Sequence, residues 1–129
     1  MLASDFGDAP DTNAGTGTGN SQTLLAVGGP SHVIDATQTT LFLGARVDAE
    51  ANATPNARAN GDDLVTTSPD DEDGVIEPAQ DLLLTIGSAP VVRVRATNTT
   101  GSAATLYGWI DVNRDGVFDN ATERTSVTV

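Results

Sequence analysis

The strongest constraint on the fold is the alternation of apolar and polar residues in the second half of the chain. Residues 90–96 place apolar side chains on one face of an extended segment and two arginines on the other. Residues 105–112 alternate in the same way and put Tyr107 and Trp109 together on one face. A period of two residues is that of a half-buried β-strand. These segments therefore predict strands rather than helices.

Turn-forming residues separate several such apolar runs. Gly-Gly-Pro at 28–30, Gly-Ser at 87–88 and Asp-Gly at 115–116 are the clearest breaks. The runs expected to form strands are residues 23–27, 32–34, 39–47, 75–77, 82–86, 91–96, 104–112 and 124–129. Short strands at this spacing predict an all-β fold, namely an antiparallel β-sandwich. Residues 1–22 carry no apolar periodicity, and we expect them to form a loop or an extended arm.

Size and charge narrow the class of protein further. The chain has 129 residues, so we expect residues 1–129 to form a single module with one core. The net charge of −12 argues against nucleic acid as a partner. There is no cysteine for a disulfide or a thiolate metal site, and no apolar run is long enough to insert into a membrane. Met1–Ser4 is not a signal peptide, and we expect a segment of a longer secreted or cell-surface protein.

Residues 111–123 carry oxygen-bearing side chains at alternate positions, followed by a glycine that permits a sharp turn. Calcium takes about six to eight oxygen ligands, and this D-x-N-x-D-G spacing can supply most of them. An EF-hand is rejected, because the flanking segments are predicted strands and Thr122 stands where its bidentate Glu belongs. The alternative is an Asx-rich turn with Asp115-Gly116 at its tip. The expected calcium ligands are the side chains of Asp111, Asn113, Asp115 and Asp119, the carbonyl of Val117, and Glu123 as a candidate sixth.

Residues 48–73 are expected to form a long acidic loop. Its acids are Asp48, Glu50, Asp62, Asp63, Asp70, Asp71, Glu72 and Asp73. Arg58 alone opposes them, so the carboxylates repel one another unless water or cations neutralise them. We expect at least one further calcium site here, the alternative being a solvated loop. The candidate ligands are Asp48, Glu50, Asp62, Asp63, Asp71 and Asp73.

An enzyme is not expected. His32 adjoins Ser31, but there is no Gly-x-Ser-x-Gly elbow, so a structural role of the histidine is favoured. No pair of carboxylates stands out as the acid and base of a glycosidase. Tyr107 and Trp109 could form a platform for a sugar, or could pack in the core or at an edge.

The N-terminal sequence Asp5–Pro10 is typical of a tight turn. We expect Phe6 to fill the core. Asp5 or Asp8 would then reach a cation, and a plain turn is the alternative.

Several short segments together resemble the GEVED domain family in their order and spacing along nearly the whole chain. They are Asp5–Pro10, His32, Leu43-Gly44, Asp48–Glu50, Gly61–Asp63, Asp71–Val75, Trp109–Asp111, Asn113, Asp115-Gly116 and Glu123. The resemblance implies a β-sandwich module of large secreted or surface-attached bacterial proteins, beside adhesin-like, protease or anchoring domains. The Gly-Glu-Val-Glu-Asp motif of that family does not occur before Val129. We therefore expect the last strands to be truncated or supplied by a neighbouring molecule.

The function predicted from the sequence is that of a calcium-binding, calcium-stabilised structural or adhesion module, extracellular or on the cell surface. Its partners would be other domains or copies of the same protein. One alternative is a calcium-dependent carbohydrate-binding module that contacts a surface glycan through Trp109 or Tyr107. Another is an extracellular fibre subunit that completes its fold with a strand from the next copy.

Overall fold

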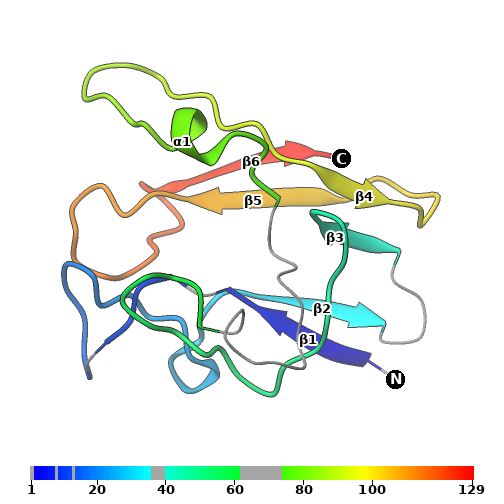
Figure 1. Cartoon of the computed structure of the whole chain (residues 1–129), viewed down its shortest axis with the longest axis horizontal. Coiled ribbons are helices and arrows are strands. Elements are labelled where there is room, and N and C mark those ends of the chain that lie inside the picture. Colours follow the sequence, from blue (N-terminus) through cyan, green and yellow to red (C-terminus); the bar gives the residue numbers. More distant parts are fainter. Residues whose placement is uncertain (1, 8, 13, 36–39, 62–73) are drawn as a thin grey trace.

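The computed structural model describes residues 2–7, 9–12, 14–35, 40–61 and 74–129 (Figure 1). Its elements, in chain order, are β1 (Leu2–Phe6), the 3-10 turn η1 (Leu25–Val27), β2 (Ser31–Asp35), β3 (Leu41–Leu43), α1 (Pro78–Asp81), β4 (Ala96–Asn98), β5 (Thr105–Trp109) and β6 (Arg124–Thr128). Strands dominate, and the α-helix is a single turn that starts at a proline. The described part of the chain is therefore all-β, as the alternating pattern predicts.

The strands form three antiparallel pairs: β1 with β2, β3 with β4, and β5 with β6. The registers place Leu2 opposite Asp35, Leu41 opposite Asn98, and Thr105 opposite Thr128. In Figure 1 the β1–β2 pair lies at the bottom of the view and the β5–β6 pair above it, with β3 and β4 toward one end.

The core is small and lies around the β1–β2 pair. Its buried apolar residues, among those described, are Phe6, Ile34 and Ala53. Phe6 fills the core as the sequence predicts. Ile34 is buried while Val33 beside it is 60% exposed, which is the alternation of a strand with one face in the core. Buried polar residues near the N-terminal arm, Asn20, Ser21 and Thr23, extend the packed region.

Several predicted strands occur, with changed bounds. Residues 32–34 lie inside β2, 104–112 contain β5, and 124–129 contain β6. Within 39–47, β3 covers Leu41–Leu43, and the turn that follows it starts at Gly44, which has a φ of +67°. Residues 75–77 contribute one isolated bridge, between Val75 and Val94.

Other predictions of the secondary structure are wrong. Residues 23–27 contain the 3-10 turn η1, and residues 82–86 are not a strand. Residues 91–96 stay extended, with alternating exposure, but join a named strand only at Ala96. In the segment after α1 the amide groups of Leu83 and Leu84 bond to carbonyls two or three residues back, which leaves them no part in a ladder. Residues 2–6, predicted to belong to an arm, form β1, because β2 offers a partner far along the chain.

No helix among the described residues is long and apolar enough to cross a lipid bilayer.

Candidate metal centre

One backbone hydrogen bond closes the base of the loop that joins β5 to β6. In it the amide of Ile110 donates to the carbonyl of Glu123 at 3.0 Å. Just beyond that bond the Asp111 carboxylate turns into the loop. Its Oδ1 accepts from the amide of Asp115 at 3.1 Å and its Oδ2 from the amide of Gly116 at 2.9 Å. Asn113 Oδ1 also accepts from the Asp115 amide, at 2.9 Å. The alternating side chains therefore curl toward the inside of the turn.

Glu123 connects the two limbs of this loop. Its side chain is buried, with the residue only 7% exposed, and each carboxylate oxygen accepts one backbone hydrogen bond. Oε1 accepts from the amide of Val112 and Oε2 from the amide of Asp119, both at 3.1 Å. A carboxylate that receives two amides from opposite limbs fixes the distance between them.

The other two predicted acids bond to the loop's own backbone. Asp115 Oδ1 accepts from the amide of Val117 at 2.8 Å. Asp119 Oδ1 accepts from the amides of Ala121 at 2.6 Å and Thr122 at 3.1 Å. These backbone hydrogen bonds, Ala121 first, lower the pKa of Asp119, so its carboxylate stays ionised. Asp119 thus faces the turn before β6, whereas Asp111, Asn113 and Asp115 are joined to one another.

The hydrogen bonds show an Asx-rich turn, and they leave capacity for a cation. A carboxylate has about four lone-pair sites, and Asp111 uses one on each oxygen for the amides above. Among the described residues, however, no three His, Asp or Glu side chains converge in a group that could hold a metal ion. A calcium ion in this loop would take part of its oxygen shell from Asn113, backbone carbonyls and water.

Residues 17–22, which belong to the N-terminal arm that follows β1, pack against this loop. The sequence did not predict this contact. The amide of Gln22 donates to the carbonyl of Gly116 at 2.9 Å, and Thr18 Oγ1 donates to the carbonyl of Arg114 at 3.4 Å. Gly116 is buried with a φ of +77°, and a Cβ there would meet the Gly17 amide nitrogen at 2.6 Å and overlap the carbonyl oxygen of Asn20. The glycine is required both for the turn and for this approach.

An aromatic group stands beside the loop. The rings of Tyr107 and Trp109 are 6.0 Å apart, and those of Trp109 and Phe118 are 6.5 Å apart. The Trp109 indole donates to Asn120 Oδ1 at 3.0 Å, while the Arg124 guanidinium lies 4.9 Å from the Tyr107 ring centroid. Trp109 is thus hydrogen-bonded to the β5–β6 loop through its indole N–H, and Tyr107 is the more exposed of these two aromatic side chains.

A second group of carboxylates forms where β1 meets the segment after β3. The amide of Glu50 donates to the carbonyl of Ser4 at 2.9 Å, and the amide of Phe6 donates to Glu50 Oε2 at 2.9 Å. This bridge brings Glu50 close to the carboxylates of Asp48 and Asp5. Asp48 and Glu50, predicted to leave on one face, therefore do lie together, and Asp5 joins them from β1.

The carboxyls of this group lie close enough to change the pKa of Glu50. Burial first, then the Asp48 carboxyl and the negative charge of Asp5, raise the pKa of Glu50 to about 8. When the carboxyls of Glu50 and Asp48 are both ionised, the buried Oε1 of Glu50 has no hydrogen-bond donor among the described residues. A buried charged oxygen without a hydrogen bond is unfavourable, and a proton shared between the two carboxyls or a bound cation would reduce this free-energy cost. The sequence left open whether Asp5 or Asp8 would reach a cation, or whether this segment is a plain turn. The pairing of β1 with β2 and the bridge from Ser4 to Glu50 place Asp5 near Glu50.

His32 lies at the margin of this group. Its Nδ1 is 3.8 Å from Asp5 Oδ2, and burial lowers the pKa of His32. Ser31, the neighbouring residue of the same strand, is exposed, and adjacent residues of a strand point to opposite faces. The remaining predicted ligands, Asp62, Asp63, Asp71 and Asp73, lie outside the described residues.

Comparison of the chain with protein-family models, curated proteins and solved structures finds no match.

Proposed function

We propose that this protein is a calcium-binding module whose bound ions stabilise an extracellular structural or adhesive protein. The observation that carries the proposal is the carboxylate group of Asp5, Asp48 and Glu50. Glu50 Oε1 is buried without a donor among the described residues, and the nearby Asp48 and Asp5 raise the pKa of Glu50, so this place is rich in carboxyl oxygens that disfavour one another's charge. The three carboxyls are not spaced as a preformed metal site, and a cation bound there would take the rest of its oxygen shell from backbone carbonyls and water. Hard divalent cations bind to sites of this chemistry, and calcium is the one that tolerates irregular oxygen shells.

The β5–β6 loop is the second site of the proposal. Asp111, Asn113 and Asp115 supply oxygens at the spacing that calcium loops use, and Glu123 already holds the two limbs together. The N-terminal arm closes over the same loop through Gly116. An ion here would therefore stiffen three separate parts of the chain, namely the arm, the loop and the end of β5.

The architecture and location belong to the same proposal. Two facing layers of short antiparallel strands, with apolar side chains between them, support a β-sandwich. The resemblance to the GEVED domain family supports a secreted or cell-surface module, and the charge of −12 is compatible with it. Such a module depends on cations because its like charges otherwise repel one another.

The test is thermal unfolding of the protein in calcium, in magnesium and in chelator, together with calcium titration calorimetry. We expect a rise in melting temperature that is specific for calcium and saturates with the measured stoichiometry. Equal melting in chelator and in millimolar calcium would remove the proposal.

Two variants assign the sites. Asp115→Ala should remove the part of the calcium response that belongs to the β5–β6 loop, and Glu50→Gln the part that belongs to the β1 group. In chelator, Glu50→Gln should melt no lower than the parent, because the amide removes a buried charge while keeping the size of the side chain. Glu77→Gln, an exposed acid in front of α1, is the matched control and should leave the calcium response unchanged.

A carbohydrate-binding module is the second candidate. It is favoured by Tyr107, which is 46% exposed next to Trp109 and lines, with it, an open cavity of about 790 Å³. Exposed aromatic rings commonly stack on sugars. Glycan-array binding that is lost in Tyr107→Ala and Trp109→Ala would support this candidate, and an array without any signal would remove it.

A further inference from the structure

In the part of the chain that the structure describes, β5 has a neighbouring strand along only one of its edges. Ala104 and Val129 exchange two backbone hydrogen bonds at 2.9 Å, just before β5 begins and just after β6 ends. In an antiparallel pair such bonded positions alternate with positions whose backbone groups point away from the partner. The amides and carbonyls of Thr105, Tyr107 and Trp109 therefore point away from β6. They have no hydrogen-bond partner among the described residues.

Two further strands have open edges of the same kind. The carbonyl of Ser4 accepts from the amide of Glu50 at 2.9 Å, on the side of β1 that faces away from β2. Val33, which stands opposite Ser4, is therefore in a position whose backbone groups point away from β1. The hydrogen bonds just before and just after β3 leave Leu41 and Leu43 in outward positions in the same way.

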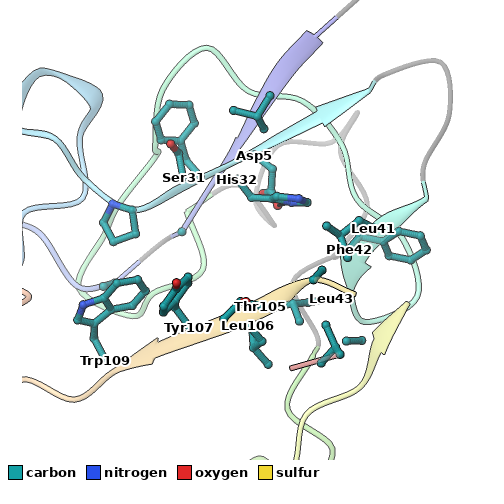
Figure 2. A pocket seen from close by; sticks show the side chains of 18 of the residues that line it. Asp5, Ser31, His32, Leu41, Phe42, Leu43, Thr105, Leu106, Tyr107 and Trp109 are labelled. Atoms are coloured by element: carbon teal, nitrogen blue, oxygen red, sulfur yellow. Dashed lines mark ion pairs between the residues drawn. The ribbon is translucent and has the colours of Figure 1, made fainter. Parts of the chain in front are cut away.

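These three edges border one open cavity of about 790 Å³ (Figure 2). Consecutive residues line it from each strand, namely 31–33 of β2, 41–43 of β3 and 104–107 at the start of β5. Successive side chains of a strand point to opposite faces, so a cavity that touches every residue of a run lies along the edge of that strand. The wall of the cavity therefore contains unpaired backbone groups as well as apolar side chains.

The apolar side chains around this cavity belong to a core that is incomplete. The buried apolar residues among those described are only Phe6, Ile34 and Ala53, whereas Leu43 and Tyr107 at the cavity are 38% and 46% exposed. A two-stranded hairpin such as β5–β6 is marginally stable by itself. Unpaired backbone groups beside apolar side chains add to the free-energy cost. The cavity is thus in the position of a missing strand.

We propose that this cavity binds an extended segment of a partner protein, which pairs with the free edge of β5 as an added strand. The unpaired backbone groups select this occupant, because they repeat at every second residue, about 6.8 Å apart, and another strand has the same repeat. The five residues of β5 offer an edge of about 17 Å, which suits a segment of five to seven residues.

The side chains of the bound segment follow from the walls of the cavity. A strand that pairs with β5 turns every second side chain toward the β1–β2 pair, where Phe42, Leu106 and Trp109 also line the space. The segment therefore carries apolar residues at alternate positions. It is free of acids, since Asp5 lies at the wall. A partner protein is favoured over a second copy, because copies with a net charge of −12 repel one another.

The first test is the binding of a synthetic peptide, acetyl-Lys-Val-Thr-Val-Thr-Val-Lys-amide, to the whole chain in chelator. Emission from Trp109, the single tryptophan, reports binding from about 1 µM to 1 mM. We expect saturable binding. The same peptide with N-methyl groups on its valine and threonine amides is the control, since it keeps the side chains and the charge but cannot donate to a strand edge. It should bind at least about tenfold more weakly.

The second test compares Thr105→Pro with Thr128→Pro. These two threonines stand opposite one another in the β5–β6 hairpin, and both are exposed. Neither contributes a bond to the ladder between the two strands, so a proline at either position keeps that ladder. Thr105→Pro removes an amide from the free edge of β5 and should weaken peptide binding by about tenfold. Thr128→Pro changes the opposite edge of the hairpin and should bind the peptide as the parent does.

The third test needs no variant. Hydrogen exchange of the parent, measured by NMR, should be fast at the amides of Thr105, Tyr107 and Trp109 and slower at those of Leu106 and Gly108, which face β6. Saturating peptide should slow the exchange of the first three amides by about tenfold or more. A ligand that only side chains hold would leave their exchange unchanged.

Any of four results would overturn the inference: no peptide binding up to 1 mM, equal binding of the N-methylated peptide, equal effects of Thr105→Pro and Thr128→Pro, or unchanged exchange at the three outward amides of β5. Oligomers of the chain alone that Thr105→Pro abolishes would place the added strand in a second copy and overturn the separate partner. The pairing uses backbone groups of β5 and no proposed calcium ligand. Peptide binding in chelator without any calcium effect on melting would therefore remove the calcium proposal and leave this one standing.

Discussion

The structure predicts that Glu123 supports the β5–β6 loop even when no calcium is present. Both oxygens of this buried carboxylate accept backbone amides, from Val112 and Asp119 at 3.1 Å each. A hydrogen bond to a charged group contributes about 1.5–3 kcal/mol. Val112 and Asp119 are themselves exposed, so water can reach their amides after truncation, and the lower value applies. Glu123→Ala should therefore reduce the free energy of unfolding by about 3 kcal/mol.

Glu123→Gln separates charge from hydrogen bonding. The amide keeps one acceptor oxygen for one of the two amides and presents an NH₂ group to the other, so the loss should be about half that of the alanine variant. For a domain of this size, a loss of 3 kcal/mol corresponds to a fall in melting temperature of roughly 10 °C.

The assay is urea unfolding in chelator, followed by Trp109 fluorescence and by far-ultraviolet circular dichroism. The two probes are needed because Trp109 lies beside the loop and its emission can change locally. Glu77→Ala, at an exposed position, is the control. A Glu123→Ala variant that matches the parent in chelator and differs only in calcium would refute the reasoning, since Glu123 would then act as a ligand and not as a support.

Three further predictions follow from the same contacts. The folded state raises the pKa of Glu50 from 4.5 to about 8, so the contribution of Glu50 to the free energy of unfolding is complete below pH 4.5 and is lost as the pH rises toward 8. After discounting for solvent screening, the free energy of unfolding in chelator should fall by about 1–2 kcal/mol over that window. A flat pH profile in calorimetry would contradict this prediction. Calcium should abolish this fall, because the cation takes the place of the proton. Gly116→Ala should cost about 2 kcal/mol or more in urea unfolding, because φ is +77° and the Cβ meets the arm, so a neutral outcome would show that the arm does not pack there. Asn120→Ala should shift the fluorescence of Trp109 by removing the 3.0 Å bond to its indole, with unchanged emission counting against that contact.

Local patterns predicted the parts of this fold that rest on short-range physics. The alternation in residues 104–112 and 124–129 gave β5 and β6, because a period of two residues matches the pleat of a strand. The acidic residues between them were predicted to curl around one point, and their carboxylates and amides do turn inward onto the loop. Asx residues bond to amides a few positions ahead, so such turns need no distant partner.

Other features depended on contacts that no local pattern records. Leu83 and Leu84 belong to an apolar run that favours a strand, yet their amides bond locally, because a strand exists only where a partner ladder is available. The packing of the arm on Gly116 was invisible for a similar reason, since a glycine in a turn looks the same whether or not another segment approaches it.

The sequence by itself determined the all-β character, the net charge of −12 and the composition of the acidic loop between β5 and β6, because propensity, charge and turn chemistry act between near neighbours. Only the tertiary structure decided which carboxylates meet. The pairing of β1 with β2 carries Asp5 toward Glu50, 45 positions away in the chain, and the bridge between Ser4 and Glu50 completes the group. The cavity between β1–β2 and β5 arises in the same way, since it requires segments that are distant in the chain to face one another.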